Sequence, residues 1–177
     1  MTAHTGQSAP GDRAFTAAPE SFERLLAGVR DGAAASGVFA GAEVVSDKLR
    51  GRMLRCPALA SAEPAEFRVF FEGGRVWLGL VTEARWLSQS IEADLVHTGD
   101  KMEDLIEEEL IDQGLEGMRL SVEHFRDDAK LFTFRSALPL EAGGLDASSS
   151  IDRTVRCLLA YEAAFRPLGD MEAHDDE

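Results

Sequence analysis

The chain of 177 residues has few cysteines, few aromatic residues and no long apolar run. Its two cysteines, Cys56 and Cys157, lie far apart in the sequence, which excludes a disulfide framework and a zinc or redox site of the CxxC type. No segment approaches the roughly 20 apolar residues that span a membrane. No repeat or heptad period is present either. We therefore expect a soluble globular protein that is large enough to bury a core of its own.

Basic residues are also scarce, because 18 Lys and Arg stand against 32 Asp and Glu, for a net charge of −14. The acidic excess lies in two segments. Residues 83–116 hold 11 acidic and 2 basic side chains, and residues 170–177 hold 5 acidic side chains and no basic one. A nucleic-acid partner needs a basic surface, and so does an anionic membrane, so neither is expected. The acidity predicts a solvated surface, or one that attracts a basic partner.

The two ends of the chain differ in composition from its middle. Residues 1–19 are mostly Ala, Thr, Gly, Ser and Pro, which predicts a disordered tail without the basic and apolar regions of a secretory signal. Residues 170–177 predict an acidic tail. A single α+β domain is expected between them, over residues 20–169. Free thiols without a signal indicate a cytoplasmic protein.

Apolar residues at helical spacing predict helices in three regions. The first helix covers residues 20–35. Residues 85–113 form two helices, and the second of these begins at a capping box of Asp100 and Glu103. The last helix begins at a capping box that starts with Ser149. The buried stripe predicted for the helix that starts at residue 85 consists of Trp86, Leu87, Ile91 and Leu95.

Alternating residues predict a strand from Asp47 to Arg55. Lys48, Arg50 and Arg52 would then share the outer face of this strand. Such a basic face has two interpretations. It pairs with the protein's own acidic side chains as a solvated face or protects an edge from aggregation, or it docks an acidic peptide by strand addition at an exposed edge.

The clearest local signal is a hairpin over residues 66–82, in which a Gly-Gly pair forms the turn. One face of this hairpin is apolar and is predicted to be core; it consists of Phe67, Val69, Phe71, Val76, Leu78 and Leu80. The other face carries Arg68 and places Phe70 directly opposite Trp77. An aromatic pair on the second face needs cover from a helix, a second subunit or a partner.

A second hairpin is predicted over residues 120–140. The expected order is therefore α-β-β-β-α-β-β-α, a two-layer α+β domain with an antiparallel sheet of about five strands packed with helices. This order resembles the type III secretion chaperone-like fold and, within it, the YbjN-like family, over about residues 20–170. The segments that carry the resemblance are Phe67–Leu80, Asp100–Ile111, Lys130–Ser136 and Ile151–Leu168. The resemblance implies a non-enzymatic, usually dimeric module that binds proteins or peptides.

We therefore expect a chaperone-like or regulatory adaptor that forms a homodimer. Its predicted partner-binding residues are Phe70, Trp77 and Arg68 on the sheet, with Lys48, Arg50 and Arg52 on the basic strand. No catalytic residue, cofactor or metal site is predicted. The alternative is a small enzyme or ligand sensor with a pocket between helix and sheet, in which Arg68 or Arg135 holds an anion and His124 acts as acid or base. A third interpretation is a structural domain of a larger assembly.

Overall fold

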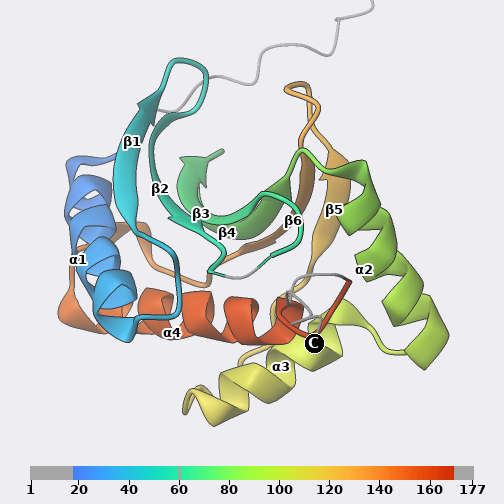
Figure 1. Ribbon diagram of the computed structural model, residues 1–177. Helices are drawn as coiled ribbons and strands as arrows, with labels where there is room; N and C mark the ends of the chain where they lie inside the picture. The colour runs from blue at the N-terminus through green and yellow to red at the C-terminus, as the bar shows by residue number, and fades with distance from the viewer. Residues whose placement is uncertain (1–17, 60, 170–177) are drawn as a thin grey trace, which may run out of the picture.

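The computed structural model describes residues 18–59 and 61–169, and it has one strongly curved, antiparallel sheet with helices on its convex side (Figure 1). Six strands follow one another across the sheet in the order β1-β2-β3-β4-β6-β5. The strands are β1 (Glu43–Asp47), β2 (Gly51–Pro57), β3 (Ala65–Glu72), β4 (Arg75–Thr82), β5 (Glu123–Arg126) and β6 (Phe132–Ala137). The helices are α1 (Glu20–Ser36), α2 (Arg85–Thr98), α3 (Met102–Asp112) and α4 (Ser148–Phe165), with a short 3-10 turn at Ala142–Gly144. The predicted α+β class is confirmed, and most of both predicted tails lies outside the described residues.

The predicted strand from Asp47 to Arg55 is wrong in its first half. Asp47 ends β1, and its carboxylate Oδ1 accepts hydrogen bonds from the backbone N of Leu49 at 2.7 Å and of Arg50 at 2.9 Å. This side chain closes a turn, and Gly51 then begins β2 with a φ of 74°. A turn therefore interrupts the segment that the alternating residues predicted to be one strand. As a result the sheet has six strands.

The hairpin of β3 and β4 has the predicted register. Glu72 faces Arg75 at the turn, and Phe70 faces Trp77. The face predicted to be core packs against α1 and α4; Phe67, Val69, Leu78 and Leu80 on it are fully buried, and Phe71 is half-buried. The ring centroid of Phe71, on this face, lies 5.5 Å from that of Phe22 on α1.

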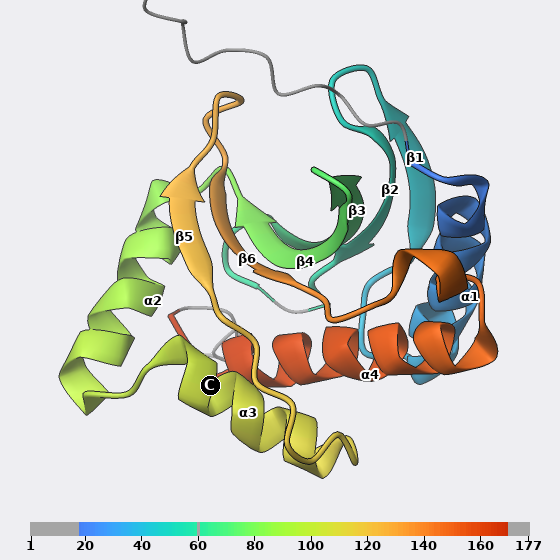
Figure 2. The same ribbon diagram turned by 180° about the vertical axis from the view of Figure 1, so that it is seen from behind.

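Helices α1 and α4 approach each other closely beneath the sheet (Figure 2). Two glycines of α1 allow this contact. A Cβ atom at Gly28 would lie 2.8 Å from Ile151, and one at Gly32 would lie 2.6 Å from Val155. Tyr161 of α4 is fully buried, and its hydroxyl lies 2.5 Å from that of Ser136 on β6. This hydrogen bond satisfies two polar groups inside the core.

Neither predicted capping box forms. Lys101 is the N-cap of α3, and the carboxylate of Glu103 instead accepts a hydrogen bond from the backbone N of Val122 at 3.2 Å. Helix α4 starts at Ser148, before the predicted cap at Ser149, and its N-cap makes no side-chain hydrogen bond. In α3, an acidic side chain predicted to cap its own helix thus binds the chain segment that leads to β5.

The sheet is bent so strongly that two diagonally opposite corners rise on its concave side (Figure 1). The corners are the β1–β2 turn at residues 48–50 and the β5–β6 turn at residues 127–131. Gly79, in the middle of β4, permits the bend, because a Cβ atom there would lie 2.6 Å from the carbonyl oxygen of Phe134 on β6. No helix among residues 18–59 and 61–169 has the length and apolar character to cross a membrane.

Candidate functional site

The concave face of the sheet forms the candidate site, because the described helices all lie outside the curve (Figures 1 and 2). One row of directly paired residues crosses this face from edge to edge. Its members are Glu43, Arg55, Arg68, Gly79, Arg135 and Glu123. A row with three arginines is unusual in so acidic a chain. Like charges placed directly opposite repel each other, so each arginine needs a carboxylate nearby.

Apolar side chains next to this row bury one another without any helix above them. Met53 is 2% exposed and Phe70 is 4% exposed, although both lie outside the main core cluster. Trp77 is half-buried, and its indole Nε1 donates a hydrogen bond to the backbone oxygen of Glu72 at 3.0 Å. The curvature of the sheet thus provides much of the cover that the Phe70–Trp77 pair requires, and part of the Trp77 ring stays accessible.

Arg135 holds the centre of the face together. Its guanidinium lies 4.0 Å from the ring centroid of Trp77 and 4.8 Å from that of Phe125. Its Nε donates to Glu123 at 2.9 Å, and its Nη1 forms an ion pair with Glu72. Two aromatic rings and two carboxylates contact this arginine, so it is a structural element of the groove floor.

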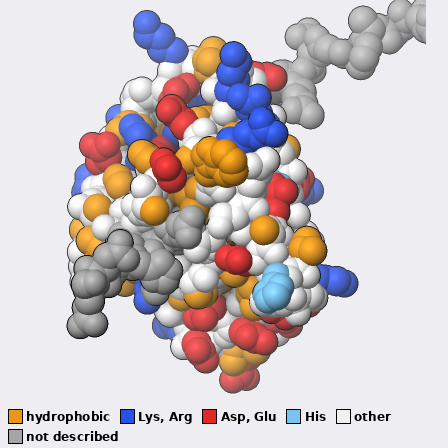
Figure 3. All heavy atoms as spheres, turned by 45° about the vertical axis from the view of Figure 1, so that its right-hand side comes forward, with side chains coloured by type: hydrophobic (Ala, Val, Ile, Leu, Met, Phe, Trp, Pro, Cys, Tyr) orange, Lys and Arg blue, Asp and Glu red, His pale blue; other side chains and the backbone are white. Residues whose placement is uncertain are grey.

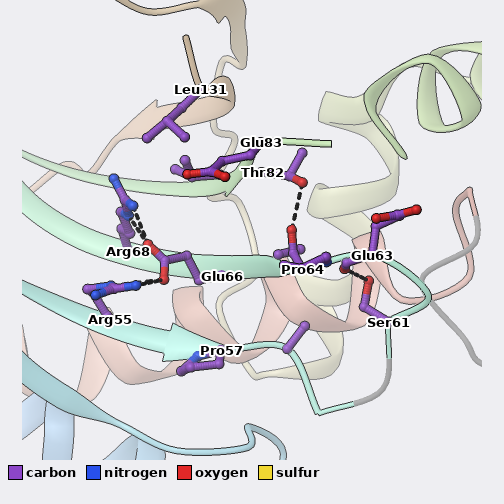
Figure 4. A pocket seen from close by; sticks show the side chains of 13 residues that line it. Arg55, Pro57, Ser61, Glu63, Pro64, Glu66, Arg68, Thr82, Glu83 and Leu131 are labelled. Atoms are coloured by element: carbon purple, nitrogen blue, oxygen red, sulfur yellow. Dashed lines mark hydrogen bonds and ion pairs between the residues drawn. The ribbon is translucent and has the colours of Figure 1, made fainter. Parts of the chain in front are cut away.

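Arg55 and Arg68 share a single carboxylate, that of Glu66 (Figure 4). Arg55 donates to Oε2 from Nε at 2.9 Å and from Nη2 at 2.5 Å, and Arg68 pairs with Oε1. The hydrogen bonds to Glu66 raise the pKa of Arg55 above its ordinary value. Glu43 lies directly opposite Arg55 in the row, and the Nη1 groups of both arginines make no hydrogen bond to the described residues.

A half-open pocket of about 430 Å³ adjoins this cluster, between the concave face and two loops (Figure 4). Its lining comprises Arg55, Pro57, Ala58, Ser61, Glu63, Pro64, Ala65, Glu66, Arg68, Val81, Thr82, Glu83 and Leu131. Thr133 lies on the same face, paired with Val81, and its hydroxyl is buried without a hydrogen-bond partner among the described residues.

The structure separates the three basic residues that the sequence assigned to one strand face. Lys48 and Arg50 lie in the raised β1–β2 turn, and the side chain of Arg50 forms an ion pair with Asp127 in the opposite corner. Arg52 lies on β2 but points to the convex side, where its Nε binds Glu23 of α1 at 3.1 Å. The prediction that these three residues share one strand face is therefore wrong. Only Lys48 and Arg50 border the concave groove.

The residues of the alternative site also lie apart. His124 pairs with Phe134 on the convex side and stacks on its ring, with a centroid distance of 3.7 Å, whereas Arg68 and Arg135 lie on the concave side. The Nδ1 of His124 lies 3.0 Å from the backbone oxygen of Thr133. Its Nε2 lies 2.5 Å from Glu92 of α2 and 3.5 Å from the hydroxyl of Ser88. Because the carboxylate and the hydroxyl share one nitrogen, this is not the arrangement of a nucleophilic triad.

The two thiols lie in the core. Burial raises the pKa of Cys56 and of Cys157 to about 12, so both are protonated at neutral pH and are poor nucleophiles. In the described segments, no three His, Cys, Asp or Glu side chains gather closely enough to bind a metal ion.

Comparisons with protein-family models, with curated proteins and with solved structures found no match for this chain. The YbjN-like resemblance therefore remains a prediction. Sequence reasoning missed the roles of Arg55, Glu66 and Phe125. Alternation along β2 and β3 could have placed the first two on the face of Arg68, but Phe125 reaches Trp77 only through pairing of distant strands.

Proposed function

We propose that this chain is a non-enzymatic binding module that holds an extended, acidic segment of a partner polypeptide in the concave groove of its sheet. The observation that carries the proposal is the groove itself: the described helices leave this face uncovered, while its arginine cluster and Trp77 stay partly accessible. An adaptor or chaperone of this kind would bind by burial of apolar side chains and would select its partner by charge.

Guanidinium donors support an acidic partner. Arg55 and Arg68 share Glu66 and keep unused donors, which suit a carboxylate, whereas Glu63 and Glu83 line the pocket beside them. Figure 3 shows acidic side chains at the lower end of the molecule and others among the basic side chains of the upper part, and every charged side chain of α3 is Glu or Asp. A carboxylate that enters the groove therefore avoids the most acidic part of the surface.

Apolar contacts around the groove support a polypeptide. Leu49, at the tip of the β1–β2 corner, is 74% exposed, and Leu59, in the loop that lines the pocket, is 63% exposed. Trp77 lies on β4 in the groove floor, farther across the sheet than either leucine. Separate apolar positions suit an extended segment with several side chains. The outer edges of β1 and β5 also have no neighbouring strand in the described part of the chain, so backbone pairing can add to the affinity.

A small anionic ligand in the pocket is the second candidate. The pocket volume of about 430 Å³ lies in the range of small-molecule sites, and Arg55 and Arg68 could orient a carboxylate there. This candidate differs from the alternative predicted from the sequence, because the pocket lies between loops and the concave face, and His124 is on the other side of the sheet.

A selection from a library of random 12-residue peptides, followed by calorimetric titration of synthetic peptides, tests the proposal. We expect enriched peptides with Asp or Glu beside apolar residues, and at least about tenfold weaker binding when those acids are changed to amides. Arg55→Gln and Trp77→Ala should each weaken binding by about tenfold.

Arg52→Gln is the matched control, because Arg52 lies on the same strand as Arg55 but on the opposite face. Equal losses in the Arg52→Gln and Arg55→Gln proteins would contradict a groove site, and so would a failure to enrich any peptide. Glutarate and phosphate are titrated in parallel. Binding of either anion at micromolar concentration, without any peptide binding, would favour the small-ligand candidate.

A further inference from the structure

Two carboxylates of the pocket have no ionic partner in the described part of the chain. Glu63 precedes β3 and Glu83 directly follows β4; both line the pocket, and both are exposed. The third carboxylate in the lining, that of Glu66, is already bound by two arginines. The pocket therefore presents two unpaired anions beside an arginine pair, and an acidic ligand group alone would leave those anions without a partner.

The positive groups and the unpaired negative groups lie in different parts of the pocket. In Figure 4, Arg55 and Arg68 lie at one end and Glu63 lies at the other, with Glu83 between them. Guanidinium groups only donate hydrogen bonds, and ionised carboxylates only accept them. The lining therefore suits a ligand that carries an anion at one end and a cation at the other.

Strand register sets the separation of these groups. Thr82 is paired with Ala65, and its hydroxyl also donates a hydrogen bond to the backbone oxygen of Pro64 at 2.7 Å. Glu83 therefore begins beside Pro64, four positions from Arg68, which corresponds to about 13 Å of extended chain. The long side chains of arginine and glutamate shorten the distance between the charges themselves. In an extended ligand, side chains two or four positions apart span about 7 to 13 Å and point to the same side.

From this lining we infer that the partner segment carries a Lys or Arg two or four positions from the acidic residue that binds Arg55 and Arg68, and that this basic side chain binds Glu63 and Glu83. The inference rests on the proposed function, because it concerns the same segment in the same groove, and it adds a second recognition element. The partner is then a segment of mixed charge. Such a segment also suits the chain as a whole, since a net charge of −14 repels a uniformly acidic peptide.

Selection from a peptide library with one fixed acid tests the inference. The peptides have 12 residues, with Asp at the sixth position and random residues elsewhere. On the wild-type protein, Lys and Arg should be enriched at least about twofold at the second, fourth, eighth or tenth position relative to the odd positions between them, because only even spacings place both side chains on one side of an extended segment. The Glu63→Gln/Glu83→Gln protein should lose this enrichment and should still enrich peptides, because Arg55 and Arg68 are unchanged.

Calorimetric titration measures the contribution of the basic residue. One selected peptide is compared with the same peptide in which Gln replaces that residue. The replacement should weaken binding to the wild-type protein about three- to fivefold, as expected for an exposed ion pair, and binding to the Glu63→Gln/Glu83→Gln protein by less than about twofold. In a Glu83→Lys protein the preference should reverse, so that a peptide with Glu in place of its basic residue binds best. Both side chains are exposed, so these variants should fold, which circular dichroism checks.

Glu108→Gln/Glu116→Gln is the matched control, because it removes the same number of exposed carboxylates outside the pocket. Its peptide preference should equal that of the wild-type protein. An equal loss of basic residues in this control, or their retention in the Glu63→Gln/Glu83→Gln protein, overturns the inference. A wild-type selection without any preference for basic residues overturns it as well, and binding that still depends on Arg55 would then leave the proposed function standing. A failure to enrich any peptide overturns both.

Discussion

Arg50 and Asp127 form an ion pair across the mouth of the groove, although they lie 77 positions apart in the sequence. One residue belongs to the β1–β2 corner and the other to the β5–β6 corner. The side chain of Asp127 is only 9% exposed and that of Arg50 is 28% exposed, so water screens the pair incompletely. This contact connects the two outermost hairpins of an open sheet and resists its flattening.

Arg50→Gln should therefore lower the free energy of unfolding by about 1–2 kcal/mol, measured by urea denaturation. Asp127→Asn is the matched partner variant, because its remaining oxygen can still accept the hydrogen bond that Leu131 donates to Oδ1 at 2.9 Å. A double-mutant cycle should give a coupling free energy of about 1 kcal/mol. A coupling near zero would show that the two corners are held in place by other contacts.

Gly32→Ala should destabilise the protein, although alanine is the better helix former by about 1 kcal/mol. The new Cβ would lie 2.6 Å from Val155 on α4, and a β-branched side chain has little freedom to move away. We expect a loss of about 1–3 kcal/mol in the free energy of unfolding. Val155→Ala should restore much of this loss when combined with Gly32→Ala. A double variant as unstable as the sum of its single variants would rule out this contact as the cause.

Lys130→Gly should stabilise the protein. Lys130 is exposed in the β5–β6 turn and has a φ of 64°, a conformation that is unfavourable for residues other than glycine. Removal of its Cβ should raise the free energy of unfolding by about 0.5–1 kcal/mol, after the greater entropy of glycine in the unfolded chain is subtracted. Lys130→Ala keeps the strained backbone and removes the charge, so it should bring no gain. Equal gains in both variants would assign the effect to charge.

Stability should fall steeply at alkaline pH. Burial raises the pKa of Cys56 and of Cys157 from 9.0 to about 12, and it also raises the pKa of Tyr161. Above pH 9 the unfolded chain loses the thiol protons that the folded chain keeps, so each thiol lowers the free energy of unfolding by about 1.4 kcal/mol per pH unit until about pH 12. Below pH 9 the two thiols cause no pH dependence.

The check is urea denaturation from about pH 8 to about pH 11 with Cys56→Ala, Cys157→Ala and the double variant. Each substitution should reduce the alkaline slope by about 1.4 kcal/mol per pH unit, whatever its effect at neutral pH. Some slope should remain, because Tyr161 titrates in the same direction. An unchanged slope in the double variant would mean that the thiols lose their protons in the folded protein.

Local patterns were enough to predict the hairpin of β3 and β4. A Gly-Gly turn fixes the register, and the register then fixes which side chains face the core, as Phe67 and Leu78 do. The alternating pattern wrongly predicted a strand at residues 48–50. Charged and apolar residues do alternate there, but the Asp47 side chain accepts hydrogen bonds from two backbone amides and so forms a turn. The predicted buried stripe of α2 also included Trp86, which lies outside the core.

The groove could not be predicted from local patterns, because its shape depends on contacts between distant strands. The bend at Gly79 follows from its close approach to β6, and the mouth depends on the pair of Arg50 and Asp127. The placement of Phe125 and Arg135 around Trp77 requires the order β4-β6-β5, which no hairpin rule supplies.

The chain's two tryptophans lie on separate surfaces, Trp77 under the guanidinium of Arg135 in the groove and Trp86 in water on α2. Their indole emission should therefore differ in wavelength and in quenching by iodide. Replacement of either ring by phenylalanine leaves a single fluorophore at one surface. Each of the two surfaces thus carries one intrinsic fluorophore, so the surroundings of the groove and of α2 can be followed separately without a label.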